Sequence, residues 1–336
     1  MNNDKVIKWA IVGLGRISRR MRKVIESAKN STVAACVSSS KERAIAYAKK
    51  YKIEHALTYD ELAQNPELVD AVYICTHMNF HAKPAIMYLQ KKLPCLVEKT
   101  FGVTVAEAQQ MIDVAKENDT LIMEALWSRF LPANLYVQEV LNSGELGKIV
   151  STNSRFEVGF MHGKKSRVFK KEVGGGSILD IGIYPTTYTH MLLGNPDKIE
   201  AKGNLKNGVE IACDTVFTYD CGAVANFRVS HEFMTWKEFY NIECEKGSIK
   251  VPSFFDARKI TVKYADGKKI VRRFGRRGKP DGFIYEIEHF NDLIRNGIKE
   301  SPVMTHAITM EVMELQEEQL RQVGSEVLEL MKKENN

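Results

Sequence analysis

The sequence predicts an α/β domain on a doubly wound parallel sheet, followed by an α+β domain on an open, mostly antiparallel sheet. Three observations support this prediction. Apolar runs of strand length alternate with helical patterns as far as residue 125, which is typical of parallel strands with right-handed crossovers. From residue 148 the chain changes to alternating strands joined by turn signals, which indicates hairpins. A length of 336 residues fits two domains, which we predict at residues 1–127 and 128–336.

Each strand of the first domain is an apolar run that ends at a polar or glycine position. The expected strands cover residues 9–12, 33–37, 71–75, 95–97 and 121–125. The expected helices cover residues 16–28, 41–51, a short segment from 60, a segment that reaches 90, and 105–118. Thr104 and Glu107 form a capping-box pattern at the start of the last of these helices. Ligands bind outside the carboxyl ends of parallel strands, so the residues just after each strand are the candidate site residues.

The first strand ends in a glycine turn that opens a helix. The turn consists of Gly13, Leu14, Gly15, Arg16, Ile17 and Ser18. Gly15 removes the Cβ atom where a bulky anion would press on the backbone, and the free N–H groups of the helix carry about half a positive charge. The pattern indicates a pyrophosphate site, with Ser18 where a dinucleotide fingerprint has Gly or Ala. An ordinary strand-to-helix turn is the alternative.

The end of the second strand indicates which dinucleotide binds. An NAD site would present a carboxylate here to the ribose hydroxyls, whereas this chain has Ser38, Ser39 and Ser40, then Lys41 and Arg43. Hydroxyls and cations suit a 2′-phosphate, which a carboxylate would repel. We therefore expect NADP as the cofactor. The alternative is a helix N-cap with solvated basic residues, which leaves NAD usable.

The second domain begins with a helix and continues mainly as strands. The expected strands cover residues 150–158, 197–207, 211–219, 222–230, 236–246, 248–251, 259–264 and 269–274. The expected helices cover residues 134–142, 178–193, a segment from 281, and 305–331. The final helix is very regular and is expected to pack back on the first domain. When helices cover one face of an open sheet, the other face still needs a further layer to cover it.

Composition excludes several classes of protein. A hydrophobic content of 44% and a charged content of 27% are typical of a globular protein in water. The net charge of +6 is spread along the chain without an arginine-rich arm, so nucleic acid is not expected as a partner. The cysteines show no C-x-x-C pair and no metal pattern, so no metal site is expected, and Cys36, Cys75 and Cys95 are predicted to be reduced core residues. The chain has no signal-type segment or membrane-length apolar run, which predicts a cytoplasmic protein.

Several motifs resemble one family of enzymes. They lie at residues 13–18, 79–81, 98–100, 123–132 and 174–184. In this order, over nearly the whole chain, they resemble the glucose–fructose oxidoreductase, inositol dehydrogenase and MocA (Gfo/Idh/MocA) family, above all its dimeric dihydrodiol dehydrogenase and D-xylose dehydrogenase branch. The family usually has Pro where this chain has Thr100. The resemblance implies an N-terminal Rossmann domain and a homodimer or homotetramer through the free face of the C-terminal sheet.

The predicted chemistry involves Lys99, Asp180 and Tyr184. Asp180 and Tyr184 stand at i and i+4 of one expected helix and share a face, while Lys99 leaves a parallel strand at its carboxyl end. Oxidation of a carbinol needs a base for the hydroxyl proton, and a tyrosine serves if a nearby ammonium lowers its pKa. The resemblance implies the same roles for Lys99 and Tyr184. Asp180 would orient the lysine or a sugar hydroxyl, or would only complete a capping box.

Further site residues are expected around this group. Those expected at the cofactor, besides the glycine turn and the serines, are Arg43, Thr76, His77, Asn79, His81, Glu98, Lys99, Trp127 and Arg129. Those expected at the substrate are Lys99, Trp127, Arg155, Phe156, Asp180 and Tyr184. Two of these residues also fit a purely structural role: His81 as the start of a helix and Trp127 as a core residue.

We therefore expect an NADP-dependent oxidoreductase that transfers a hydride between nicotinamide and a carbinol or carbonyl carbon of a sugar, cyclic polyol or dihydrodiol. Two alternatives come from other classes. An NAD-dependent glycosidase would use transient oxidation and would hold its cofactor through turnover. An NAD(P)-binding sensor would bind NADPH without catalysis, and the presence of both Lys99 and Tyr184 argues against it.

Overall fold

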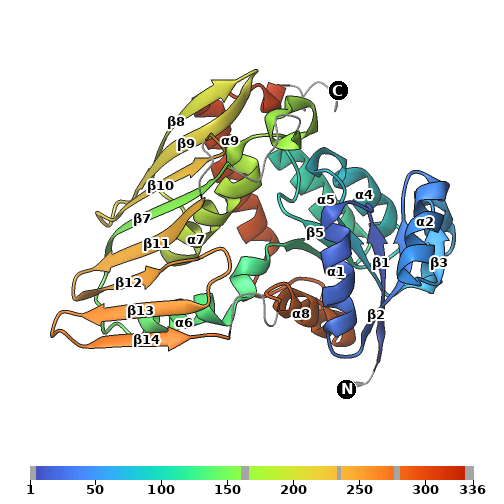
Figure 1. Ribbon diagram of the computed structural model, residues 1–336, viewed down its shortest axis with the longest axis horizontal. Coiled ribbons are helices and arrows are strands. Elements are labelled where there is room, and N and C mark those ends of the chain that lie inside the picture. The colour runs from blue at the N-terminus through green and yellow to red at the C-terminus, as the bar shows by residue number, and fades with distance from the viewer. Residues whose placement is uncertain (1–4, 160–165, 233–235, 276–280, 330–336) are drawn as a thin grey trace. The chain divides into compact units, whose positions relative to one another are not determined.

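The computed structural model describes residues 5–159, 166–232, 236–275 and 281–329 (Figure 1). These residues form two compact units. Unit 1 runs to Trp127 and includes Phe283–Met310, and unit 2 comprises Ser128–Gly282 and the chain from Glu311. The sequence predicts a single domain from residue 128 onward. In the structure, Phe283–Met310 belong to unit 1 instead.

Helix α8 (Ile284–Arg295) explains this return. The indole N–H of Trp9 donates to Asn291 Oδ1 at 3.1 Å, and the rings of Trp9 and Phe290 lie 5.3 Å apart between centroids. Trp9 and Asn291 are both fully buried, and a buried indole N–H needs such a partner. The contact spans 282 positions of the chain, so no local sequence pattern reveals it.

Unit 1 is built on a six-stranded parallel sheet in the order β3-β2-β1-β4-β5-β6. Its strands are β1 (Ile7–Val12), β2 (Ser31–Val37), β3 (His55–Leu57), β4 (Ala71–Ile74), β5 (Cys95–Glu98) and β6 (Ile122–Ala125). Its helices include α1 (Arg16–Ser27), α2 (Lys41–Tyr51), α3 (Tyr59–Gln64), α4 (Ala82–Leu89), α5 (Val105–Glu117) and α8. The strand order reverses between β1 and β4, which is the switch point of a doubly wound sheet, so the predicted fold is confirmed.

Gly13 meets a close contact at this switch point. Its φ is +95°, and a Cβ atom added to it would lie 2.8 Å from the backbone carbonyl of Cys75. A side chain at this position is therefore excluded both by the backbone conformation and by the end of the neighbouring strand. Cys36, Cys75 and Cys95 are buried and free, as the sequence predicts.

Unit 2 is built on an eight-stranded mixed sheet in the order β14-β13-β12-β11-β7-β10-β9-β8. Its strands are β7 (Ile149–Val158), β8 (Lys198–Lys206), β9 (Val209–Thr218), β10 (Val224–Ser230), β11 (Trp236–Cys244), β12 (Gly247–Val251), β13 (Lys259–Tyr264) and β14 (Lys269–Arg273). The pair β7 and β10 is parallel, and the other neighbours are antiparallel. The prediction of a mostly antiparallel sheet is thus confirmed.

Helices cover one face of this sheet. Helix α7 (Ile183–Leu193) and the later part of α9 (His306–Val323) lie against it, and α6 (Pro132–Asn142) lies near β13 (Figure 1). The Tyr240 hydroxyl bonds to Thr152 and Thr189, which joins two strands to α7. Thr215 of β9 bonds to Gln319 of α9 at 3.1 Å.

The final helix divides between the two units. The start of α9 belongs to unit 1, where the His306 ring lies 3.3 Å from the Ile122 carbonyl. From Glu311 the helix belongs to unit 2. The helix ends at Val323, short of the expected residue 331, and residues 330–331 lie outside the described ranges.

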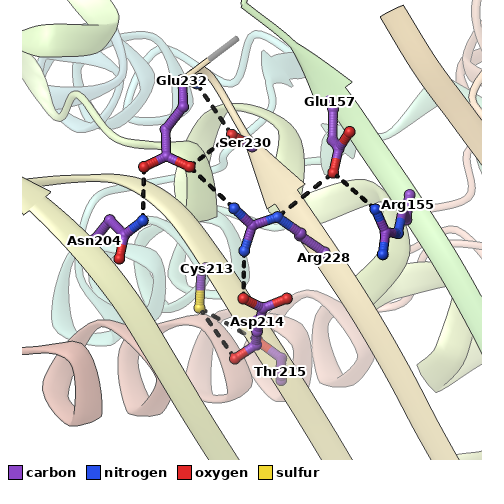
Figure 2. Close-up of polar contacts among 9 residues, drawn as sticks. All are labelled: Arg155, Glu157, Asn204, Cys213, Asp214, Thr215, Arg228, Ser230 and Glu232. Atoms are coloured by element: carbon purple, nitrogen blue, oxygen red, sulfur yellow. Dashed lines mark hydrogen bonds and ion pairs between the residues drawn. The ribbon is translucent and has the colours of Figure 1, made fainter. Parts of the chain in front are cut away.

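The opposite, outer face of the sheet carries a row of asparagines and a group of ion pairs. Asn226 of β10, Asn153 of β7 and Asn241 of β11 stand in register and form a row across three strands. Beside this row the Arg228 guanidinium contacts three carboxylates, those of Glu157, Asp214 and Glu232 (Figure 2). We call this surface, with its asparagine row and ion pairs, the outer face.

Two local expectations need correction. The Thr104 side chain caps α5 by accepting from the Glu107 N–H, but the Glu107 carboxylate accepts from Val103 N–H and not from Thr104 N–H, so the box is only half formed. The helix expected at 178–193 begins with a π-helical turn, Ile178–Gly182, before α7. Asp180 lies in this wider turn and Tyr184 in α7, so they are not spaced as in one regular helix.

Candidate active site

The glycine turn after β1 leads directly into α1. Gly15 is the residue before the helix, and a Cβ atom added to it would find no atom within 4 Å. Ser18 is fully buried, donates its hydroxyl to the Gly15 carbonyl at 2.7 Å and accepts from the Tyr47 hydroxyl at 3.2 Å. These bonds satisfy the serine at a position where a smaller residue is usual. The turn therefore presents open space at the positive end of a helix, which suits an anion.

The three serines after β2 differ in their surroundings. Ser40 caps α2 by accepting from the Arg43 N–H, and its hydroxyl donates to Glu42 at 2.7 Å. That hydrogen bond holds the pKa of Glu42 below its usual value. Ser38 is buried and accepts from the Ser40 N–H, whereas Ser39 and the Arg43 side chain are exposed. Ser40 is thus an N-cap, Ser39 and Arg43 face outward, and the choice between NADP and NAD stays a prediction.

His81 joins the segments that follow β4 and β5. Its buried ring directs Nδ1 at the carbonyls of Thr100 and Phe101, at 3.1 and 3.3 Å. With carbonyls as partners, Nδ1 carries the proton and donates. Thr76 donates to the Phe80 carbonyl, which closes the short turn that contains residues 77–79. His81 thus anchors the backbone next to Lys99 and is more than the start of a helix.

The segment after β5 is held from its other side as well. The Phe101 N–H donates to Glu124 of β6 at 3.1 Å. The Glu98 carboxylate accepts from the Tyr73 hydroxyl and, at 3.1 Å, from the Lys99 N–H. The peptide bond between Lys99 and Thr100 is cis. The backbone that carries Lys99 is therefore fixed by side chains of β4, β6 and the His81 segment.

Trp127 and Arg129 follow β6. Trp127 is 1% exposed and stacks on Phe283 at 4.4 Å between ring centroids, and the Arg20 guanidinium lies 4.5 Å over Phe283. These contacts make Trp127 a core residue of unit 1, which was one of the two readings of the sequence. Arg129 is buried and belongs to unit 2.

Asp180 lies between two basic side chains of unit 2. Arg167 donates to its Oδ1 at 2.7 Å, and the buried His231 ring places Nε2 at 3.5 Å from Oδ2. Arg167 is part of a short turn before three consecutive glycines, Gly174–Gly176, which we call the glycine run. His231 follows β10. The sequence analysis assigned no role to His231, because no local pattern shows that the end of β10 faces the turn Ile178–Gly182.

Tyr184 lies in an aromatic cluster. Its ring meets Phe255 edge-on at 4.8 Å and Phe156 at 5.8 Å between centroids. Phe156 also contacts Trp236 and Phe254, so three other aromatic residues surround the pair. We call Phe156, Tyr184, Trp236, Phe254 and Phe255 the aromatic cluster. The expected neighbourhood of Phe156 and Tyr184 is thus present within unit 2.

Arg155 does not share this neighbourhood. Successive side chains of a strand point to opposite faces, so Arg155 lies on the outer face while Phe156 faces α7. Its guanidinium lies 3.5 Å from Glu157, which also contacts Arg228 (Figure 2). Arg155 therefore belongs to the ion pairs of the outer face and is separated by the sheet from Tyr184. Lys99 lies in unit 1 and Asp180 and Tyr184 in unit 2, so their convergence stays a prediction.

Two general features of the described residues bear on the class of protein. None of the helices in these ranges is long and apolar enough to span a membrane. Within the same ranges, no three His, Cys, Asp or Glu side chains gather in a way that could hold a metal ion.

A glycine turn at the switch point of a parallel sheet, followed by a second unit on an open sheet, is the organisation of a two-domain NAD(P)-dependent dehydrogenase. Residues 7–126 match the oxidoreductase family with an NAD-binding Rossmann fold, and residues 134–250 match the GFO/IDH/MocA C-terminal domain. The chain belongs to the Gfo/Idh/MocA family of oxidoreductases, as the sequence motifs predict.

Named relatives cover almost the whole chain. It is 30% identical over 330 residues to trans-1,2-dihydrobenzene-1,2-diol dehydrogenase of Mus musculus, which covers 95% of this chain and 97% of the relative. It is 26% identical to scyllo-inositol 2-dehydrogenase (NADP(+)) IolU of Bacillus subtilis, with 95% and 98% covered. The fold is similar to that of aldose-aldose oxidoreductase from Caulobacter crescentus, with a TM-score of 0.84, 22% identity, and 95% and 98% covered.

The anchoring role of His81 predicts a difference between two substitutions. His81→Leu removes the donor to two buried carbonyls and should lower the free energy of unfolding by about 1–3 kcal/mol. His81→Asn keeps an amide N–H near the position of Nδ1 and should recover at least half of that loss. Urea unfolding of both variants measures the difference. Equal losses in the two variants would show that the hydrogen bonds from His81 do not matter.

Proposed function

We propose that this protein is an NADP-dependent oxidoreductase that transfers a hydride between nicotinamide and a carbinol or carbonyl carbon of a sugar, cyclic polyol or dihydrodiol. The placement of two side chains supports the proposal: Lys99 follows β5 in unit 1, and Tyr184 lies in the aromatic cluster of unit 2. Family membership supports the hydride chemistry. The names of the relatives, which specify a dihydrodiol, an inositol and an aldose, support the substrate class.

The residues of unit 1 fit a bound dinucleotide. The open space over Gly15 and the start of α1 would take the pyrophosphate, as the sequence predicts. The segments after β4 and β5, with Asn79, His81 and Glu98, would hold the nicotinamide half. When bound, the nicotinamide accepts or supplies the hydride.

The proton is handled by Tyr184 in this proposal. In the oxidation direction its phenolate takes the hydroxyl proton of the substrate, and in reduction its phenol returns the proton to the carbonyl oxygen. The Lys99 ammonium favours the phenolate and donates a hydrogen bond to the substrate oxygen. Asp180, oriented by Arg167 and His231, accepts from a second hydroxyl of the substrate. The aromatic cluster keeps water from the reacting carbon.

The choice of NADP rests on Ser39 and Arg43. Both are exposed beyond β2, and Ser40 is engaged as the cap of α2. The Lys41 ammonium is already paired with Glu61 at 2.6 Å, so Arg43 is the cation that supports binding of a 2′-phosphate. The name of the inositol dehydrogenase, which specifies NADP(+), agrees with this choice.

We also propose that two or four copies of the chain assemble through the outer face of unit 2. The asparagine row supports this assembly, because each side-chain amide both donates and accepts and can pair with its own copy across a two-fold axis. The family resemblance implies the same face.

Loss of the Tyr184 hydroxyl should stop proton transfer. Tyr184→Phe should lower kcat by about 10²–10⁴-fold while the KM for NADP changes less than about 3-fold, because the phenol acts on the substrate proton only. Steady-state oxidation of a panel of sugars, inositols and diols, followed at 340 nm, measures both constants.

Tyr188 offers a matched control one turn further along α7. It is buried, burial raises its pKa well above the usual value, and its ring packs on Tyr240. Tyr188→Phe makes the same chemical change and should keep kcat within about 3-fold of wild type. A Tyr184→Phe enzyme as fast as the Tyr188→Phe enzyme would end the proposed role of Tyr184.

The cofactor preference is tested at Arg43. Arg43→Ala removes a charge-assisted hydrogen bond to the 2′-phosphate and should raise the KM for NADP by about 10- to 100-fold without changing the KM for NAD. Lys41→Ala is the control, since its ammonium is held by Glu61, and it should change either KM by less than about 3-fold. A wild-type enzyme that prefers NAD would contradict the proposal directly.

Assembly is tested at the centre of the outer face. Asn153 is exposed in this single chain, so Asn153→Arg should leave the fold intact while placing like charges opposite each other in an assembly. Sedimentation velocity should show an oligomer for wild type and a monomer for the variant. Asn296→Arg, at the exposed end of α8, is the control and should sediment like wild type. A monomeric wild type would refute the assembly.

A further inference from the structure

A buried carboxylate lies behind the turn that carries Asp180. Glu210 of β9 is fully buried, and its Oε1 accepts from the Ile178 N–H at 3.2 Å. Its Oε2 accepts from the hydroxyl of Ser325, which follows α9, at 2.6 Å. One side chain thus holds together a strand, the start of the turn Ile178–Gly182 and the C-terminal segment. Neither the sequence motifs nor the proposed mechanism gives this residue a role.

The glycine run makes room for this carboxylate. Gly176 has a φ of +119°, and a Cβ atom added to it would lie 2.0 Å from Glu210 Oε1. Such an approach is impossible, so residue 176 must be glycine as long as the carboxylate occupies its place. The Gly176 carbonyl in turn accepts from the Asp180 N–H at 3.3 Å. Gly176 therefore lies against the buried carboxylate and accepts a hydrogen bond from the Asp180 N–H.

Both backbone polar groups of Ile178, in two successive peptide units, are held by side chains. Glu210 binds its N–H, and the side-chain amide of Gln316 on α9 donates to its carbonyl at 2.8 Å. Both side chains are at most 1% exposed. Ile178 opens the turn that contains Asp180 and continues into α7 with Tyr184. A shift of the Ile178 backbone would move the side chains of Asp180 and Tyr184, because a helix moves as a unit.

We propose that Glu210 is a positioning residue for the reaction: by fixing the Ile178 N–H it sets the orientation of Asp180 and Tyr184 toward the substrate. The inference rests on the proposed function, since it assigns Glu210 an effect on proton transfer by Tyr184. A misplacement of a proton-transfer group by about 1 Å is enough to lower a rate by about 10²-fold. Glu210 itself does not touch the substrate in this proposal.

The charged groups around Glu210 are few. Burial raises the pKa of Glu210 to about 7, and it raises the pKa of the neighbouring Cys213 thiol as well. Lys171, ahead of the glycine run, pairs with Glu326 next to Ser325, and Asp180 pairs with Arg167 and His231. Among the described residues, Lys171 and Arg167 are thus paired with carboxylates other than Glu210. The protein keeps a buried carboxyl group that is costly when ionised, which is understandable if its hydrogen bonds serve the site.

The test compares an apolar and a polar replacement of equal size. Glu210→Leu releases the Ile178 N–H and should lower kcat at least 10-fold while the KM for NADP stays within 2-fold, because unit 1 holds the dinucleotide in the proposed function. Glu210→Gln can still accept from Ile178 N–H and donate to Ser325, and it should keep kcat within 3-fold of wild type. Glu314→Gln, at an exposed position of α9, is the control and should match wild type. Full activity of a folded Glu210→Leu enzyme would overturn the inference.

A second variant covers the case in which Glu210→Leu does not fold. Gln316→Leu releases the carbonyl of the same residue, Ile178, and leaves the carboxylate in place, so it should show the same loss in kcat without a change in the KM for NADP. Wild-type kcat in a folded Gln316→Leu enzyme would contradict a positioning role for the Ile178 backbone.

Combined variants separate failure of this inference from failure of the proposed function. If Glu210 acts only by placing Tyr184 and Asp180, Glu210→Leu should slow an enzyme that carries both Tyr184→Phe and Asp180→Asn by less than 3-fold, since both groups that it places are already altered. A fully active Tyr184→Phe enzyme would refute the function. A slow enzyme with both substitutions that Glu210→Leu slows by a further 10-fold would refute the positioning role alone.

A measurement without substrate checks the state of the carboxyl group. Its folded pKa lies above the unfolded value, so it stabilises the fold least at high pH, and stability is lost as pH rises toward and through about 7. The melting temperature of Glu210→Gln relative to wild type should therefore rise between pH 5 and pH 8. If the difference in melting temperature between Glu210→Gln and wild type were the same at pH 5 and pH 8, the pKa of Glu210 would not be raised by burial.

Discussion

The exclusion of a side chain at two turns is the constraint on which the rest of this structure depends. At Gly13 the end of β4 comes so close that no Cβ atom fits, and at Gly176 the Glu210 carboxylate occupies the same kind of space. Each turn lies ahead of a helix that carries candidate site residues, α1 in unit 1 and α7 in unit 2. Backbone atoms confine the turn before α1, and a buried side chain confines the turn before the helix that carries Tyr184.

Much of the fold follows from periodicity in the sequence. Continuous apolar runs predict the parallel strands of unit 1, and alternating residues with turn signals predict the hairpins of unit 2. The parallel pair of β7 and β10 is beyond such reasoning, because strand partners distant in sequence leave no local mark. The return of α8 to unit 1 is hidden for the same reason, since it depends on the bond from Trp9 to Asn291.

The sequence indicates candidate site residues where a residue would act through its own chemistry, and their roles stay predictions. The structure shows open space at Gly15 and a ring contact between Phe156 and Tyr184. The sequence analysis places Arg155 beside Phe156 at the substrate because the two residues are adjacent in the chain. In a strand, adjacent side chains point to opposite faces, so Arg155 lies on the outer face and Phe156 does not. The sequence analysis does not single out His231 or Glu210, because each is notable only for a contact with a distant segment. His231 contacts Asp180, and Glu210 accepts from the Ile178 N–H.

The chain connectivity of the two units has a consequence for how the protein is made. Trp9 meets its buried partner only on α8, and the covered face of the C-terminal sheet receives α9 last. During synthesis, the first 127 residues leave the ribosome with an indole that lacks its hydrogen-bond acceptor and an apolar surface that still awaits a helix. The nascent N-terminal unit therefore completes this part of its core only after α8, which follows unit 2's strands in the chain, has been synthesised.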